Sequence, residues 1–198
     1  MGATTATTSN RIVTIPNVLS LVRLACLPWF VWLLLVQNDR ANAAWLLGAL
    51  GATDWVDGYI ARHFDQVSEL GKVLDPTADR LLFLVGVGAI IIDGSAPLGF
   101  SVLVLAREAL LGITLVVLTL MGMERFDVRW AGKAGTFLLM FAFPLFLMGE
   151  AGSNWFEQTC HVAAWLVGIP GLVISYYAAF SYVPVMRQAL AAGRRGNQ

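Results

Sequence analysis

The feature that most constrains the fold of this sequence is a series of apolar runs, most of them about as long as a membrane-spanning helix. A helix needs about 20 residues to cross about 30 Å of hydrocarbon. Six runs occur, at about 18–36, 43–60, 72–92, 98–121, 134–148 and 160–182, of which the fifth is short. Several are separated by turn-forming residues, such as QNDRAN at 37–42 and DGSAP at 93–97. We therefore predict an all-α integral membrane protein with six transmembrane helices.

The composition agrees with a membrane protein and argues against other classes. Charged residues make up 13% of the chain and the mean hydropathy is +0.70, whereas soluble domains carry about 25% charged residues. The formal net charge is zero, which gives no reason to expect nucleic acid as a partner. Cys26 and Cys160 lie in or beside apolar runs. They offer neither a disulfide framework nor metal-ligand spacing.

The distribution of basic residues predicts the orientation of the helices. If the N-terminus is inside, the outer connections contain one basic residue, Arg40. The inner segments then contain Arg11, Arg62, Lys72, Arg125, Arg129, Lys133, Arg187, Arg194 and Arg195. Because basic residues are enriched in cytoplasmic segments, both termini are expected in the cytoplasm and the chain in the cell membrane. We interpret 1–198 as a single domain, with an N-terminal juxtamembrane segment at 1–16 and a flexible cytoplasmic tail at 189–198.

An alternative for the first run is a cleavable secretory signal. Arg11 and Arg23 precede an apolar stretch, and the small residues ANA follow at 41–43. We favour a membrane span, because the apolar stretch begins late for a signal and the rest of the chain is also apolar.

An acidic stretch interrupts this apolar pattern between the second and third runs. Five residues at spacings i, i+3, i+4, i+7 and i+8 share one helix face: Asp54, Asp57, Gly58, Ala61 and Arg62. Three more, at i, i+4 and i+8, share a face of the next helix: Gly71, Asp75 and Asp79. The polar residues between the two sets predict a cytoplasmic turn. The carboxylates are thus expected to converge across a helical hairpin at the inner edge of the membrane.

Four converging carboxylates at membrane depth are costly unless a cation compensates their charge. Oxygen ligands suit Mg²⁺, Mn²⁺ or Ca²⁺, and no His/Cys cluster suits zinc. Two ions about 4 Å apart can clamp a phosphoryl group that undergoes displacement. Gly58 and Gly71 would let a flat base or a diphosphate approach the backbone, and Arg62 offers phosphate a forked donor. Pairing with a nearby Arg or Lys would explain any one aspartate but not the whole pattern.

The string D-x2-D-G-x2-A-R-x8-G-x3-D-x3-D at 54–79 resembles the signature of the CDP-alcohol phosphotransferase family. A looser resemblance extends over TIPNVLSLVRL at 14–24, LAREALL at 105–111 and WAGKAGTF at 130–137. Within the family, the chain is most similar to bacterial phosphatidyltransferases that use CDP-diacylglycerol. It particularly resembles actinobacterial cardiolipin synthases and the related phosphatidylglycerophosphate synthases.

The resemblance implies a six-helix membrane fold with a polar cavity open to the cytoplasm, assembled as a homodimer among membrane lipids. It implies two Mg²⁺ or Mn²⁺ ions coordinated by Asp54, Asp57 and Asp75, with Asp79 both near the second ion and acting as the catalytic base. It also implies a CDP site lined by Gly58, Ala61, Arg62 and Gly71. We expect direct in-line transfer with release of CMP, because no Ser, Cys or His nucleophile lies beside the motif.

The acceptor alcohol is the open question. Phosphatidylglycerol, which would give cardiolipin, is preferred; glycerol 3-phosphate, which would give phosphatidylglycerophosphate, is the alternative, and an inositol phosphate is more distant. Arg107, Lys133 and Arg23 are candidates for the acceptor or lipid phosphate, since basic residues inside spans are costly unless functional. Arg107 could instead pair with Glu108, and Lys133 could simply extend to the membrane surface.

Two other classes of protein use aspartates in membranes. Membrane prenyltransferases bind diphosphate through two separated aspartate motifs, but here no second aspartate-rich motif follows Asp79. A non-enzymatic cation channel or carrier would leave Gly58, Arg62 and Gly71 unexplained.

Overall fold

The chain folds into helices alone over the part that the computed structural model describes. It describes residues 15–63, 71–120 and 130–181, with side chains except at 15–17, 54–63, 71–79, 115–120, 130, 131 and 133. Those residues form six helices and no strand: α1 Ile15–Leu35, α2 Arg40–His63, α3 Gly71–Asp93, α4 Leu98–Leu120, α5 Trp130–Gly149 and α6 Trp155–Phe180. Each predicted apolar run corresponds to one helix, so the all-α prediction is confirmed. Most of the predicted juxtamembrane segment, the tail at 189–198 and the predicted turn at 64–70 lie outside the described residues.

Five of the six described helices begin before their predicted apolar runs. The polar first turns at Arg40, Trp130 and Trp155 are helical although hydropathy does not mark them. At α2 the carboxylate of Asp39 accepts hydrogen bonds from the backbone N–H of Asn42 at 3.0 Å and from its side chain at 2.6 Å. This is an N-cap, and these bonds lower the pKa of Asp39.

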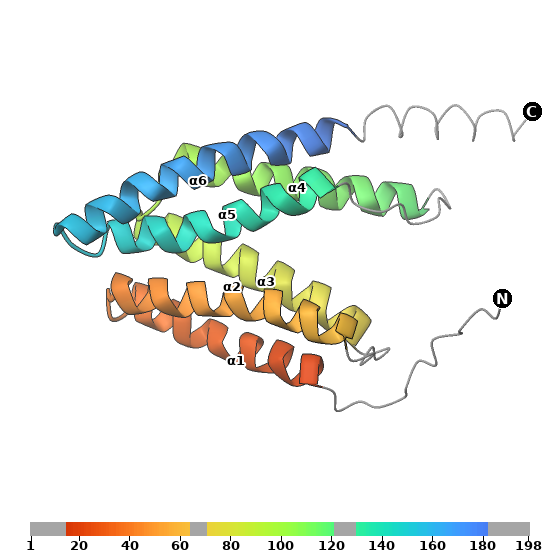
Figure 1. The fold of residues 1–198 in the computed structure, drawn as a ribbon, viewed down its shortest axis with the longest axis horizontal. Coiled ribbons are helices and arrows are strands. Elements are labelled where there is room, and N and C mark those ends of the chain that lie inside the picture. Colours follow the sequence, from red (N-terminus) through yellow and green to blue (C-terminus); the bar gives the residue numbers. More distant parts are fainter. Residues whose placement is uncertain (1–14, 64–70, 121–129, 182–198) are drawn as a thin grey trace, which may run out of the picture.

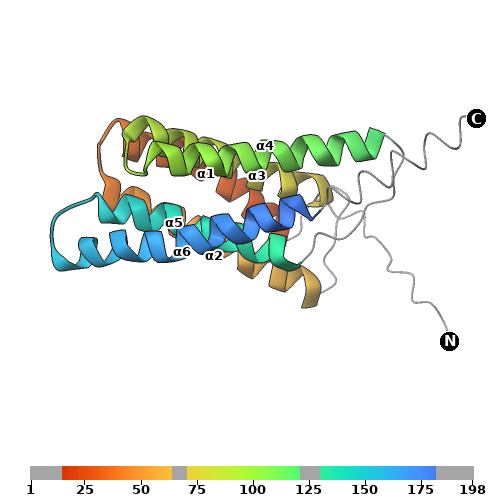
Figure 2. The same ribbon diagram turned by 90° about the horizontal axis from the view of Figure 1, so that it is seen from above.

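Successive helices run in opposite directions (Figure 1). The odd-numbered helices begin, and the even-numbered helices end, at the end of the bundle that holds the last turns of α2 and the first turns of α3, as both views show (Figure 2). We call this the motif end. The opposite end carries the connections at 36–39, 94–97 and 150–154, and we call it the loop end.

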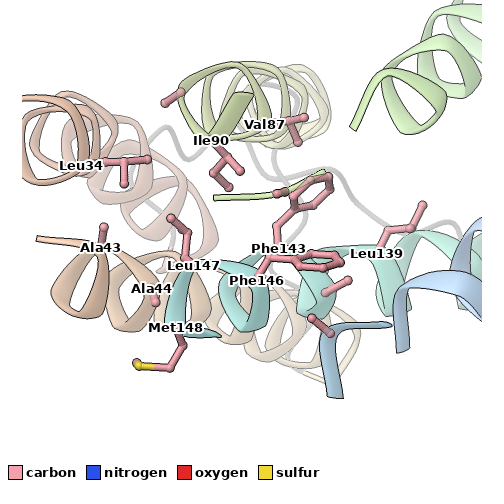
Figure 3. Close-up of a cluster of buried hydrophobic side chains, with 14 of the residues drawn as sticks. Leu34, Ala43, Ala44, Val87, Ile90, Leu139, Phe143, Phe146, Leu147 and Met148 are labelled. Atoms are coloured by element: carbon pink, nitrogen blue, oxygen red, sulfur yellow. The ribbon is translucent and has the colours of Figure 1, made fainter. Parts of the chain in front are cut away.

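The main apolar core lies in the half of the bundle near the loop end. Phe100 of α4 packs its ring against Phe143, Phe146 and Trp165, with centroid distances of 5.8, 5.3 and 5.9 Å. In Figure 3, Phe143 and Phe146 lie among buried side chains of other helices, such as Ile90 of α3. The core thus makes α5 the central helix.

Glycines allow α5 and α6 to pack closely along their length. A Cβ at Gly135 would lie 2.8 Å from the Cβ of Ser175, and one at Gly171 would lie 2.9 Å from the Cβ of Leu138. Small residues at such interfaces let two membrane helices approach backbone to backbone. The packing of α5 on α6 therefore depends on the missing side chains.

A polar cluster joins the three connections at the loop end. Arg40 donates from Nε to Asp93 Oδ2 at 2.9 Å, from Nη1 to the Glu150 carbonyl at 3.1 Å and from Nη2 to the Asp93 carbonyl at 3.3 Å. Ser95 also donates to Asp93. We call this group the Arg40 clasp. It explains why the outer connections carry a basic residue at all, since its charge is paired with Asp93.

The bundle exposes large apolar side chains on its outside. Two described helical segments, Val18–Leu35 and Trp155–Phe180, are long and apolar enough to cross a membrane, and Ala134–Gly149 is a shorter apolar helix. One exposed face of α6 consists of Val162, Leu166, Ile169, Val173, Tyr177 and Phe180. Apolar surface of this extent is typical of contact with lipid or a partner. That all six helices span the membrane stays a prediction.

Candidate active site

The backbone places the acidic motif on two helices at the motif end. The last turns of α2 carry Asp54, Asp57, Gly58, Ala61 and Arg62. The first turns of α3 carry Gly71, Asp75 and Asp79. Both sets are continuously helical, as the spacing predicts, so each set shares one helix face.

A contact nearer the loop end indicates the register of α2 against α3. A Cβ at Gly86 of α3 would lie 3.6 Å from Cδ1 of Leu47 on α2. About two helical turns further toward the motif end, α2 reaches Asp54 and α3 reaches Asp79. Two turns restore nearly the same face of a helix. By this register the backbones of Asp54 and Asp79 lie at about the same level along the bundle.

Three buried leucines, one from each of α1, α2 and α3, lie about one helical turn nearer the loop end. Leu27, Leu50 and Leu82 form one cluster and are 7%, 6% and 5% exposed. We call them the leucine floor. It is a small apolar cluster apart from the main core, placed between that core and the motif end.

One helical turn nearer the motif end than the leucine floor, each of the three helices carries a charged residue. From Leu27, Leu50 and Leu82 a step of three or four residues toward the motif end leads to Arg23, Asp54 and Asp79, on the same helix faces. Arg23 is 2% exposed although it is an arginine. The register therefore brings the predicted Arg23 to the same layer as two of the motif aspartates.

Arg107 is the second buried arginine. It lies in the middle of α4, is 2% exposed, and donates from Nη1 to Glu108. This ion pair is the alternative that the sequence suggested for Arg107. The pair does not satisfy the whole group, because within the described part of the chain Nε has no hydrogen-bond partner. An unpaired donor on a buried guanidinium is costly unless an anion meets it.

The register of α4 against α6 gives the level of Arg107 along the bundle. A Cβ at Gly168 of α6 would lie 2.9 Å from Cζ of Phe100 on α4. About two turns further along these parallel helices come Ser175 and Arg107, again on the same faces. Ser175 in turn meets Gly135 of α5. Arg107 is thus level with Ser175 and Gly135.

The contact of α2 with α5 connects the two sides of the bundle. A Cβ at Gly51 would lie 3.0 Å from Cε of Met140. Toward the motif end, Asp57 lies about 9 Å beyond Gly51 and Gly135 lies about 7.5 Å beyond Met140, at 1.5 Å per residue in these antiparallel helices. Since Arg107 is level with Gly135, it is also level with Asp57. Lys133 lies two residues before Gly135 in α5.

The donor set of the motif fits a hard divalent cation. Asp54, Asp57, Asp75 and Asp79 supply only carboxylate oxygens, on two helices whose register puts Asp54 level with Asp79. Among the described side chains, no group of three His, Cys, Asp or Glu residues could hold a metal ion, and the motif aspartates are not among those side chains. Oxygen ligands of this kind suit Mg²⁺ or Mn²⁺.

Some features of the site could not be read from the sequence. Ser175, with its hydroxyl bonded to the Leu172 carbonyl at 2.9 Å, and Tyr176, whose hydroxyl reaches α4, carry no motif. In the sequence, the three leucines of the leucine floor do not differ from other leucines in the apolar runs. Their positions depend on which helices pack together.

Comparison with known proteins gives consistent results. The family model for CDP-alcohol phosphatidyltransferases matches residues 13–170, a range that contains every predicted site residue. The chain is 37% identical over 190 residues to "Cardiolipin synthase (CMP-forming)" of Streptomyces coelicolor, covering 93% of this chain and 87% of the relative. It is 32% identical over 173 residues to a CDP-diacylglycerol–glycerol-3-phosphate 3-phosphatidyltransferase of Rickettsia bellii, covering 82% and 91%.

Proposed function

This chain belongs to the CDP-alcohol phosphatidyltransferase family, and from that premise we propose that it transfers the phosphatidyl group of CDP-diacylglycerol to phosphatidylglycerol. The products are cardiolipin and CMP. Support for this acceptor comes from the greater identity to the CMP-forming cardiolipin synthase than to the glycerol-3-phosphate transferase. The observation that carries the proposal is the shared layer of Arg23, Asp54 and Asp79 beneath the leucine floor.

Members of this family are generally dependent on a divalent metal. The aspartates of the motif (Asp54, Asp57, Asp75 and Asp79) would hold two Mg²⁺ or Mn²⁺ ions. Bound there, the ions would neutralise the diphosphate and make CMP a better leaving group. The CDP group would lie against Gly58, Ala61, Arg62 and Gly71, where the glycines leave room and Arg62 meets phosphate.

Asp79 would take the proton from the acceptor hydroxyl. The hydroxyl oxygen then attacks the lipid-side phosphorus, the new O–P bond forms, and the bond from that phosphorus to the CMP oxygen breaks. CMP leaves with the electron pair of that bond. A carboxylate is suited to this role because one positioned base contributes about 10²- to 10⁴-fold to the rate of such a transfer.

The acceptor would bind on the α4 and α5 side of the motif. Arg107 supplies a buried guanidinium with an unpaired Nε, and Lys133 lies at the start of α5. Both are suited to the phosphate of phosphatidylglycerol, and Arg23 to the phosphate of the donor lipid. Arginine is favoured for such contacts because its fork matches phosphate oxygens.

The enzyme would lie in the cell membrane of a bacterium, crossing it six times, with both termini and the site on the cytoplasmic side. Its relatives named above are bacterial proteins. A polar cavity at the motif end is supported by the four buried polar residues that lie toward that end, Ser20, Arg23, Arg107 and Ser175. Assembly as a homodimer remains part of this proposal.

Glycerol 3-phosphate is the second candidate acceptor. The similarity to the Rickettsia bellii transferase, over 82% of this chain, favours it. It is a smaller molecule with a free phosphate, so it would need the basic residues of α4 and α5 without needing room for two more acyl chains.

The test offers purified protein CDP-diacylglycerol with Mg²⁺ or Mn²⁺ and with one acceptor at a time. Lipid products are identified by mass spectrometry and CMP release is measured in parallel. We expect cardiolipin from phosphatidylglycerol, and loss of turnover with EDTA that is restored by the metal. Phosphatidylglycerophosphate from glycerol 3-phosphate alone would establish the second candidate. Absence of lipid product with every alcohol acceptor would overturn the proposal.

A further inference from the structure

Core packing and one hydrogen bond attach α4 to the bundle ahead of Arg107. Near its start, Phe100 packs among Phe143, Phe146 and Trp165, and Val104 is fully buried in the same core cluster. One turn later, the hydroxyl of Tyr176 on α6 donates to the backbone carbonyl of Leu103 at 2.9 Å. No other side-chain hydrogen bond joins α4 to another helix among those seen in the described residues.

The carbonyl of Leu103 is directly connected to the position of Arg107. In an α-helix the carbonyl of one residue accepts the N–H of the fourth residue after it. The Leu103 oxygen therefore closes the helical turn that ends at Arg107. Tyr176 also follows Ser175, the α6 residue that is level with Arg107. Its hydrogen bond therefore joins α6 to α4 at the helical turn that ends at Arg107.

We propose that Tyr176 is a positioning residue for Arg107. Held by this bond, α4 aims the unpaired Nε of Arg107 at the phosphate of the acceptor. The role rests on the proposed function, in which Arg107 binds that phosphate. A buried guanidinium cannot move out to solvent to correct its direction, so a small rotation of α4 would misalign the donor. The donor lipid, bound by the motif of α2 and α3, is not affected.

The test compares Tyr176→Phe with Tyr177→Phe. The first variant removes the hydroxyl and keeps the ring, which contacts Phe180 with centroids 6.2 Å apart. The second removes the same group from the neighbouring residue, which is 68% exposed on the apolar face of α6. We expect Tyr176→Phe to raise KM for the acceptor about three- to tenfold, in line with the loss of one interhelical hydrogen bond. KM for CDP-diacylglycerol should stay close to that of the wild type, the unfolding temperature should fall by no more than about 5 °C, and Tyr177→Phe should match the wild type throughout.

A double variant separates positioning from a direct contact. On an Arg107→Lys background, Tyr176→Phe should change KM for the acceptor less than twofold, because the group it positions has gone. If Tyr176→Phe raised KM for the acceptor on that background as much as in the wild type, the role would be overturned. The same holds if Tyr176→Phe and Tyr177→Phe gave equal KM values for the acceptor, or if Tyr176→Phe raised KM for the donor and the acceptor equally. If the wild type turns over no acceptor, the proposed function fails and this role fails with it. If the wild type is active and the tyrosines behave alike, only this inference fails.

Discussion

At the scale of single residues, Asp79 has the most specific of the proposed roles. Its backbone lies at about the level of Asp54 on α2, one helical turn nearer the motif end than Leu82. We predict that Asp79→Asn lowers the rate of transfer at least about 100-fold, because the amide cannot accept the proton of the acceptor hydroxyl. Binding of CDP-diacylglycerol, measured by equilibrium dialysis with radiolabelled lipid in detergent, should change little.

Asp54→Asn is the matched comparison for that prediction. Asp54 is expected to hold metal alone, so its loss should weaken donor binding as well as transfer. If the two variants lost donor binding equally, Asp79 would be another metal ligand and not the base.

Arg107 allows a second prediction at this scale. Arg107→Lys keeps the positive charge but removes the Nε donor and the planar fork. We expect KM for the acceptor to rise about tenfold while KM for CDP-diacylglycerol stays within twofold, as measured by product formation at varied substrate. Arg80→Lys is the control, since Arg80 is an exposed arginine on α3. A rise in the donor KM instead would assign Arg107 to the donor phosphate.

Residue-level prediction from the sequence succeeded where the signal was local. The helical spacing of the motif and the pair of Arg107 with Glu108 involve near neighbours, and the structure contains both a helix at each set and that ion pair. Arg40 shows the opposite case. Its partners, Asp93 and Glu150, are 53 and 110 residues away, and no spacing rule connects residues so distant. The roles of the motif aspartates stay predictions.

At the scale of helices, the contact of α5 with α6 should be sensitive to a single methyl group. Gly135→Ala would place a Cβ 2.8 Å from both the Cβ and the backbone nitrogen of Ser175. Because backbone cannot give way as a flexible side chain does, we expect a loss of about 1 to 3 kcal/mol in stability. Unfolding in detergent, followed by circular dichroism, should show a lower midpoint.

Gly112→Ala in α4 is the control for that prediction. A Cβ at Gly112 would meet nothing within 4 Å. Alanine should therefore be neutral or slightly stabilising in this helix. Equal destabilisation by the two variants would mean that the α5 and α6 interface is looser than described.

The Arg40 clasp allows a prediction about the stability of the protein that does not involve its active site. Arg40→Met removes the partner of Asp93, whose side chain is 5% exposed. A buried carboxylate that loses its ion-pair partner, even with the Ser95 hydroxyl still bonded to it, destabilises a protein by about 1 to 3 kcal/mol. We expect a lower unfolding midpoint with unchanged KM for both substrates, because the clasp lies at the loop end. A changed acceptor KM would show that the loop end is coupled to the site.

The limits of helices were predicted less well than their existence. Hydropathy places the sixth run at 160, but α6 begins at Trp155, with Glu157 in its first turn. A carboxylate is favourable at a helix N-terminus, so the polar first turn is helical for electrostatic reasons that an average of hydropathy does not detect.

At the scale of the whole molecule, the described aromatic core is concentrated in the half of the bundle near the loop end. The leucine floor lies between this core and the level of Arg23, Asp54 and Asp79. The sequence predicts six apolar helices and an acidic hairpin. It does not predict this division, because the division arises from which helices pack together and in which register.

The orientation of the bundle in the membrane provides the last prediction. Trp45 and Trp155, 66% and 78% exposed, lie near the loop end, as interfacial aromatics do, whereas most basic residues of the described helices lie toward the motif end. We expect the loop end outside the cell. In a Cys26→Ser, Cys160→Ser background that retains activity, Ser153→Cys, at an exposed loop-end position, should react with a membrane-impermeant maleimide in intact cells. Arg194→Cys should react only after the membrane is permeabilised. The reverse pattern would place the motif end outside and contradict a cytoplasmic active site.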